Sequence, residues 1–133
     1  MTSKLMRWAG YALTGAFTVF MLFDVGIKLM RHPIVEETMR QLGFNGGLGF
    51  AIGVIEAVCL VLYWMRRTAI LGAVLFTGLF GGAIATHLRH EDPLFSHVLF
   101  GVYLGLFMWG GLWLRDPLLR SLFPVRRVRC DRA

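Results

Sequence analysis

Residues 66–97 read RRTAILGAVLFTGLFGGAIATHLRHEDPLFSH, and this stretch decides the fold. Within it, residues 69–88 form a run of 20 residues without a charged side chain. A helix rises about 1.5 Å per residue, so this run is as long as the hydrocarbon core of a bilayer, about 30 Å. We therefore predict a membrane-spanning helix at 69–88, with arginines before it and histidines after it.

Glycines interrupt this predicted span and remove side-chain bulk from its surface. Gly78 and Gly82 are four residues apart, and Gly101 and Gly105 repeat this spacing in a later apolar segment. Small residues at this spacing allow the backbones of membrane helices to approach closely. We therefore expect both helices to pack against neighbours through these glycines.

The composition supports a membrane protein. The chain has 133 residues, of which 56% are hydrophobic, and a formal net charge of +6. Its basic residues lie at the ends of apolar runs and are not interleaved with aromatics on a polar face, so we exclude nucleic acid as a partner. Cys59 and Cys130 do not form a C-x-x-C motif, which argues against a dithiol redox centre.

The remaining apolar segments complete a single all-α membrane domain over residues 1–133, a four-transmembrane-helix bundle. The predicted spans are 8–28, 48–65, 69–88 and 94–114. Two short amphipathic segments, 33–43 and 117–123, are predicted to lie in the membrane interface. A proline lies near the start of each, and Asp116 precedes the second as an expected N-cap, as Asp92 precedes the last span.

Lysine and arginine are distributed unequally between the two sides of this bundle. Four spans place both termini on one side, which carries ten basic residues, against four on the other. The positive-inside rule then predicts cytoplasmic termini and a multi-pass protein of the inner membrane. The ten are Lys4, Arg7, Arg66, Arg67, Arg115, Arg120, Arg126, Arg127, Arg129 and Arg132; the four are Lys28, Arg31, Arg40 and Arg89.

Glu56 is the charged residue whose insertion into the membrane costs the most free energy, because it lies about 12 Å inside the second span. Such a carboxylate marks function by default, although a protonated glutamate that joins helices is the structural alternative. Counting the same depth in the other spans reaches Phe20, Phe80 and Tyr103. We predict that Glu56 meets Tyr103 across the space left by Gly81 and Gly82.

A polar mouth is expected above this pair. Asp24 and Lys28 share a helix face at i,i+4 spacing, and they form either an interfacial ion pair or part of a site. The predicted mouth consists of Asp24, Lys28, His87 and Arg89, with His97 one turn inside the last span. A pocket with an acid, a phenol and charged groups at its opening suits a lipophilic molecule with a polar head group, such as a quinone, an isoprenoid or a lipid.

Several short motifs resemble those of the DoxX-like family of small bacterial membrane proteins. They are D-x-x-x-K-L at 24–29, L-G-F at 42–44, G-x-x-E at 53–56, R-T-x-x-L-G-A at 67–73, T-G-x-x-G-G-A-x-A-T-H-L-R at 77–89 and L-R-D-P at 114–117. The resemblance implies a four-helix membrane bundle, in a family mostly without an assigned activity. Some members of the wider DoxX group are linked to quinone-dependent thiosulfate oxidation or to redox-stress complexes, but no motif here carries thiosulfate chemistry.

Our first hypothesis is a redox-associated module that binds a quinone or another lipophilic molecule. Glu56 and Tyr103 would bind or protonate the head group, and His87 would relay protons to the outer face. The predicted ligand-binding residues are Asp24, Lys28, Phe20, Phe80, Gly81, Gly82, Arg89 and His97. Whether the protein is an enzyme stays open.

Three alternatives belong to other classes. A transporter of small cations is less favoured, because four-helix exporters carry their glutamate in the first span and often show weaker charge bias. A metal site at His87, His90 and His97 rests only on an H-x-x-H spacing at the interface. The third is an assembly subunit that docks a partner redox enzyme or a second copy of itself.

Overall fold

The computed structural model describes residues 3–126 and 128, and every regular element in this part of the chain is helical. A π-helical turn, η1, directly precedes α5. In chain order the elements are α1 (Ser3–Leu29), α2 (Pro33–Gln41), α3 (Leu48–Trp64), α4 (Ala69–Arg89), η1 (Leu94–Val98), α5 (Phe100–Arg115) and α6 (Pro117–Leu122).

Three of these helical segments are long and apolar enough to cross a membrane. They are α1, α4 and the continuous segment Leu94–Arg115, which joins η1 to α5. The fourth long helix, α3, is apolar but shorter, with 17 residues. The chain is therefore a helical membrane protein with several crossings.

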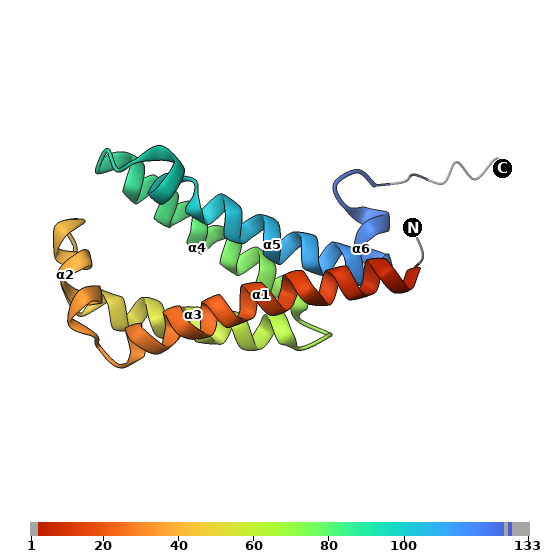
Figure 1. Ribbon diagram of the computed structural model, residues 1–133, viewed down its shortest axis with the longest axis horizontal. Coiled ribbons are helices and arrows are strands. Elements are labelled where there is room, and N and C mark those ends of the chain that lie inside the picture. Colours follow the sequence, from red (N-terminus) through yellow and green to blue (C-terminus); the bar gives the residue numbers. More distant parts are fainter. Residues whose placement is uncertain (1–2, 127, 129–133) are drawn as a thin grey trace.

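The four long helices form a ring. Helix α1 packs against α3 and α5, and α4 packs against the same two helices, while α2 contacts α3. Figure 1 shows that successive long helices run in opposite directions. It also shows that they lie close together at the end that carries α6 and diverge toward the end that carries α2 and η1. We call these two regions the α6 end and the α2 end.

An aromatic cluster fills the bundle between its centre and the α6 end. The ring of Phe17 meets Tyr63, Phe76 and Phe80 edge to face, with centroids 5.4, 5.4 and 6.3 Å apart. The hydroxyl of Tyr63 donates a hydrogen bond of 2.8 Å to the backbone oxygen of Met108. The cluster therefore joins α1, α3 and α4, and the bond of the buried Tyr63 hydroxyl connects them to α5.

Glycines permit the closest backbone approaches in this packed region. A Cβ at Gly72 would lie 2.5 Å from the backbone nitrogen of Tyr63, and a Cβ at Gly111 would lie 2.9 Å from that of Thr14. Gly10 faces the backbone oxygen of Gly111 at the same crossing. The α3–α4 and α1–α5 contacts therefore depend on the absence of a side chain at these positions.

The predicted packing role of the other glycines is only partly correct. Gly101 does pack against a neighbour, because a Cβ at this position would lie 3.1 Å from Cγ1 of Ile84. No atom lies within 4 Å of that position at Gly78, Gly82 or Gly105. The prediction is wrong for these three, because their spacing fits a close crossing but their side of the helix meets no neighbouring backbone.

The element boundaries agree with the sequence except at two places. Helix α1 begins at Ser3, five residues before the predicted span, and the last span begins with η1 instead of an α-helical turn. Asp116 caps α6 as predicted, since its side chain accepts hydrogen bonds from the backbone of Leu118 and Leu119. Asp92 does not cap the last span, because no side chain caps η1.

Candidate functional site

A cavity of about 530 Å³ lies at the α2 end, where the helices diverge. Residues from α1, α2, α3, α4, η1 and α5 line it, and most of them are apolar. Gly78 and Gly82 form part of its wall on α4, so the missing side chains leave room inside the bundle. The volume is in the range of small-molecule sites in proteins, about 300–1,000 Å³.

Three charged side chains form a cluster on the cavity wall. The ammonium of Lys28 donates to Oδ2 of Asp24 at 2.6 Å and to the two carboxylate oxygens of Glu56 at 2.8 and 2.9 Å. The Glu56 side chain is 5% exposed, Lys28 is 13% exposed and Asp24 is 24% exposed. We call these residues the ion triad; Asp24 is its most accessible member.

The local sequence explains how the ion triad assembles. Asp24 and Lys28 are one helical turn apart on α1, in the favourable order of acid before base. On α3, a Cβ at Gly53 would lie 2.7 Å from Cβ of Lys28, so only glycine leaves room for the lysine stem. Glu56 lies three residues further along the same face and receives the ammonium. The G-x-x-E motif is therefore a lysine-docking site.

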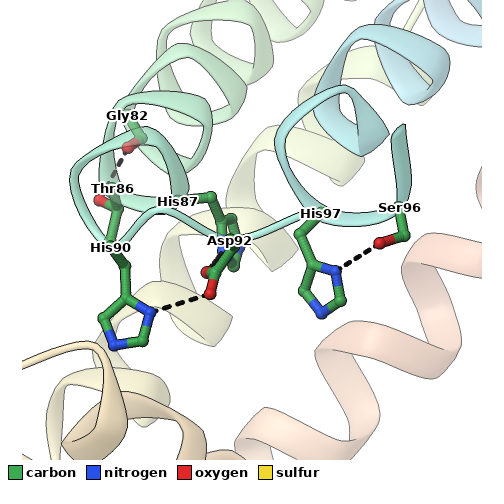
Figure 2. A network of polar contacts seen from close by, with 7 residues as sticks. All are labelled: Gly82, Thr86, His87, His90, Asp92, Ser96 and His97. Atoms are coloured by element: carbon green, nitrogen blue, oxygen red, sulfur yellow. Dashed lines mark hydrogen bonds and ion pairs between the residues drawn. The ribbon is translucent and has the colours of Figure 1, made fainter. Parts of the chain in front are cut away.

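Histidines from two elements, His87 of α4 and His97 of η1, line the cavity. Nδ1 of His87 lies 2.6 Å from Oδ2 of Asp92, and Nδ1 of His90 lies 2.8 Å from Oδ1 of the same carboxylate. Figure 2 shows both rings directed to Asp92, in the turn between α4 and η1, with His97 beside them. The rings of His87 and His97 meet edge to face, 5.7 Å between centroids.

The turn that carries this network is tightly wound. Glu91 has a left-handed backbone conformation, with a φ of 58°, which a non-glycine residue adopts only at some cost. The hydrogen bonds of His87 and His90 to Asp92 join the residues before Glu91 to the residue after it, and so hold the turn. The predicted N-cap role of Asp92 is therefore replaced by a contact with the end of the preceding helix.

The Asp92 contacts shift two pKa values outside the spans. Hydrogen bonds from His87 and His90 lower the pKa of the Asp92 carboxyl below its ordinary value. The hydrogen bond to Asp92, together with the negative charge of that carboxylate, raises the pKa of His90. Asp92 therefore stabilises the turn above about pH 4, and this contribution disappears as the pH falls through its folded pKa. His90 contributes fully below about pH 6.5 and loses its contribution as the pH rises through its raised pKa.

We expect the turn between α4 and η1 to be better protected from hydrogen exchange at about pH 5.5 than at about pH 9. The hydrogen bond to Asp92 raises the pKa of His90, so its charge and this contact are present at the lower pH and are lost as the pH rises through that raised pKa. Hydrogen-exchange mass spectrometry of the purified protein, expressed as protection factors, measures the difference. Asp92→Asn is the control and should remove most of it. An equal pH dependence in that variant would contradict the assignment.

The structure brings most of the predicted site residues to one cavity and leaves three outside. The cavity lining includes Phe20, Asp24, Lys28, Glu56, Phe80, Gly82, His87 and His97. Gly81, Arg89 and Tyr103 are not part of it. Tyr103 borders a separate groove of about 230 Å³ between α1 and α5. The predicted contact between Glu56 and Tyr103 is therefore wrong, and Lys28 occupies the place expected for the phenol.

The sequence left open whether the segment at 33–43 caps the mouth of the bundle or only connects two spans, and the structure places α2 on the cavity wall. Thr38, Met39 and Leu42, in and just after this helix, line the cavity together with Phe44. A Cβ at Gly49 would lie 2.7 Å from the Val35 side chain, so this glycine allows α2 to dock on α3. The apolar stripe of α2 was visible in the sequence, but the surface that it covers was not.

The described histidines do not form a metal centre. No group of three or more histidine, cysteine or acidic side chains in residues 3–126 and 128 is arranged to hold a metal ion. His87 and His90 both direct Nδ1 to Asp92, while His97 lies beside Ser96. Cys59 is buried and carries a free thiol, and Cys130 lies outside the described residues.

Comparison with known proteins agrees with the resemblance of the motifs. No curated protein and no solved structure gives a significant match to the chain. A family model described as the DoxX-like family matches residues 12–111, which include the ion triad, both histidines of the cavity and most of α5. With a fold of several apolar helices around an internal cavity, this chain belongs to the DoxX-like family.

Proposed function

We propose that this protein binds a lipophilic molecule with a polar head group, such as a quinone, an isoprenoid or a lipid, in the cavity at the α2 end. One observation carries the proposal: an internal cavity of about 530 Å³ has mainly apolar walls and an ion triad on one side. Apolar walls suit a hydrocarbon portion, and a few convergent polar groups suit a head group.

We further propose that α3 is a fourth membrane crossing. Its 17 residues span about 26 Å, close to the thickness of the hydrocarbon core. It lies in the ring between α1 and α4, both of which are long enough to cross. A shorter helix within a bundle is accommodated by local thinning of the bilayer or by its flanking residues.

The charge distribution supports an orientation in this proposal. Lys4, Arg7, Arg66 and Arg67 lie at the α6 end, as do Arg115 and Arg120. We propose that this end faces the cytoplasm and that the cavity opens toward the other leaflet of a bacterial inner membrane. The ion triad then lies in the outer half of the bilayer, where water and lipid head groups are close.

The same arrangement supports a role for the cavity in proton movement. Glu56 and His87 both line it, and carboxylate and imidazole side chains are the groups that proton relays in membrane proteins commonly use. His87 also contacts Asp92 in the turn outside the spans. We propose that a bound head group exchanges protons with the exterior along this side of the cavity.

Filling the cavity should weaken binding without disturbing the fold. We expect Gly82→Leu to weaken the binding of a decyl-substituted benzoquinone at least about tenfold, because the new side chain enters the cavity. Gly81→Leu is the matched control: the neighbouring glycine also has open space but lies outside the lining. Titration of protein in lipid nanodiscs, corrected with empty nanodiscs, measures both. Equal affinities in the two variants would contradict the proposed site.

A further inference from the structure

The polar groups of the cavity show a marked excess of hydrogen-bond acceptors over available donors. An ammonium group has three N–H donors, and Lys28 makes three short contacts, one to Asp24 and two to the oxygens of Glu56. The only cation of the ion triad is therefore committed to its two carboxylates.

The threonine hydroxyls of the lining are committed in the same way. The hydroxyl of Thr38 donates to the backbone oxygen of Ile34 at 2.7 Å, and that of Thr86 donates to the oxygen of Gly82 at 2.9 Å. Both bonds lie within the hydroxyl's own helix. Each oxygen keeps lone pairs that can accept a hydrogen bond, so these residues also face the cavity as acceptors.

The histidines of the lining complete the inventory. Nδ1 of His87 lies 2.6 Å from the Asp92 carboxylate, which can only accept, so this nitrogen carries the proton. In a neutral His87 ring, Nε2 is then an acceptor. Nδ1 of His97 lies 2.7 Å from the hydroxyl of Ser96, and either tautomer satisfies that contact. Of the two described histidines that line the cavity, only His97 can therefore present a donor to it while its ring is neutral.

The net charge of the ion triad favours the same kind of ligand as the excess of hydrogen-bond acceptors does. Two carboxylates and one ammonium give the ion triad a formal charge of −1, and Asp24 is its most exposed member. Asp24 uses Oδ2 for its bond to Lys28, and a carboxylate has about four lone-pair positions. In a low-dielectric cavity this excess negative charge repels an anionic head group and attracts a donor or a cation.

We infer that the cavity selects a head group that donates hydrogen bonds, an amine or a hydroxyl, over one that only accepts them. This inference rests on the proposed function and specifies its ligand class. Within the quinone class, it favours the hydroquinone, which has two O–H donors, over the quinone, whose carbonyl oxygens only accept. Among single-chain lipids, it favours an amine over a carboxylate or a phosphate. Asp24 is the residue that meets the head group.

Two matched pairs of probes test this inference. Dodecylamine and laurate share a twelve-carbon chain, and a decyl-substituted hydroquinone and its quinone share their tail and ring. We expect the amine to bind at least about tenfold more tightly than laurate and the hydroquinone about fivefold more tightly than the quinone. Titration into nanodiscs that contain the protein, corrected with empty nanodiscs of the same uncharged lipid, gives these ratios.

Variants of Asp24 test whether the preference arises from the ion triad. Asp24→Asn should reduce the ratio of the dodecylamine affinity to the laurate affinity to about threefold or less, because it removes one negative charge at constant side-chain size. Asp24→Glu should preserve the preference. Glu91→Gln is the control for loss of a carboxylate outside the cavity lining, and it should leave both ratios unchanged.

The outcomes separate the inference from the proposed function. If laurate or the quinone binds as well as its partner to the unmodified protein, or if Asp24→Asn keeps the full preference, the inference is wrong although the cavity still binds. If none of the four probes binds and Gly82→Leu changes nothing, the proposed function fails as well. If Asp24→Asn does not fold, the unmodified protein and Asp24→Glu still decide the question.

Discussion

Lys28→Met should destabilise the bundle by about 3–5 kcal/mol, the cost of leaving buried charges without their partner. Methionine preserves the length of the side chain but removes the ammonium that bonds to Asp24 and Glu56. The two carboxylates then face each other in a site where Glu56 is almost fully buried. Reversible unfolding in mixed micelles measures the free energy of unfolding.

Two variants serve as controls for this prediction. Lys4→Met removes a charge from the exposed start of α1 and should change the free energy of unfolding by less than about 0.5 kcal/mol. The triple variant Lys28→Met, Asp24→Leu, Glu56→Met should recover most of the loss, because buried ionic groups can be replaced by apolar residues of similar volume at little cost. If Lys28→Met alone is neutral, the ion triad does not stabilise the bundle.

Gly72→Val should lower the free energy of unfolding by about 3 kcal/mol, because it forces α3 and α4 apart. A Cβ at this position would lie 2.5 Å from the nitrogen and 2.8 Å from the Cα of Tyr63, and 2.9 Å from the backbone oxygen of Cys59. All three are backbone atoms, which cannot move aside as the end of a side chain can. The clash is with the backbone of Tyr63, whose side-chain hydroxyl bonds to Met108, so a shift of this residue should weaken that contact as well.

Gly78→Val, six residues further along α4, is the matched control. No atom lies within 4 Å of the position of its Cβ, so the free energy of unfolding should change by less than about 1 kcal/mol. Because Gly78 lines the cavity, this variant should instead weaken ligand binding. Equal destabilisation by the two substitutions would show that the packed and hollow faces of α4 are assigned incorrectly.

The cavity and its buried acid could be predicted from sequence because both depend on depth in the membrane. The apolar run around Glu56 defines how far this residue lies from the end of its helix. The free-energy cost of placing a carboxylate at that depth in the hydrocarbon core identifies it as unusual. Depth does not define rotation about the helix axis. Tyr103 lies at the same depth as Glu56 but faces a different groove, whereas Lys28 reaches Glu56 from α1.

The role of each glycine could not be predicted for a related reason. Gly72 and Gly78 are the same residue in the same apolar helix, yet one touches a neighbouring backbone and the other borders empty space. Spacing along one helix contains no information about where the next helix lies. The π-helical turn at Leu94–Val98 was also missed, because the sequence predicted a regular helix from residue 94 with Asp92 as its N-cap.

The helices of this bundle meet tightly near α6 and separate toward α2, and the glycines follow the same division. Gly10, Gly72 and Gly111 belong to the tight region, and Gly78 and Gly82 belong to the cavity wall. Substitutions at the second group can therefore reshape the binding space while the first group maintains the assembly. A lineage that kept the tight crossings could acquire new ligands by exchanging one or two wall residues, which makes this small scaffold readily adaptable.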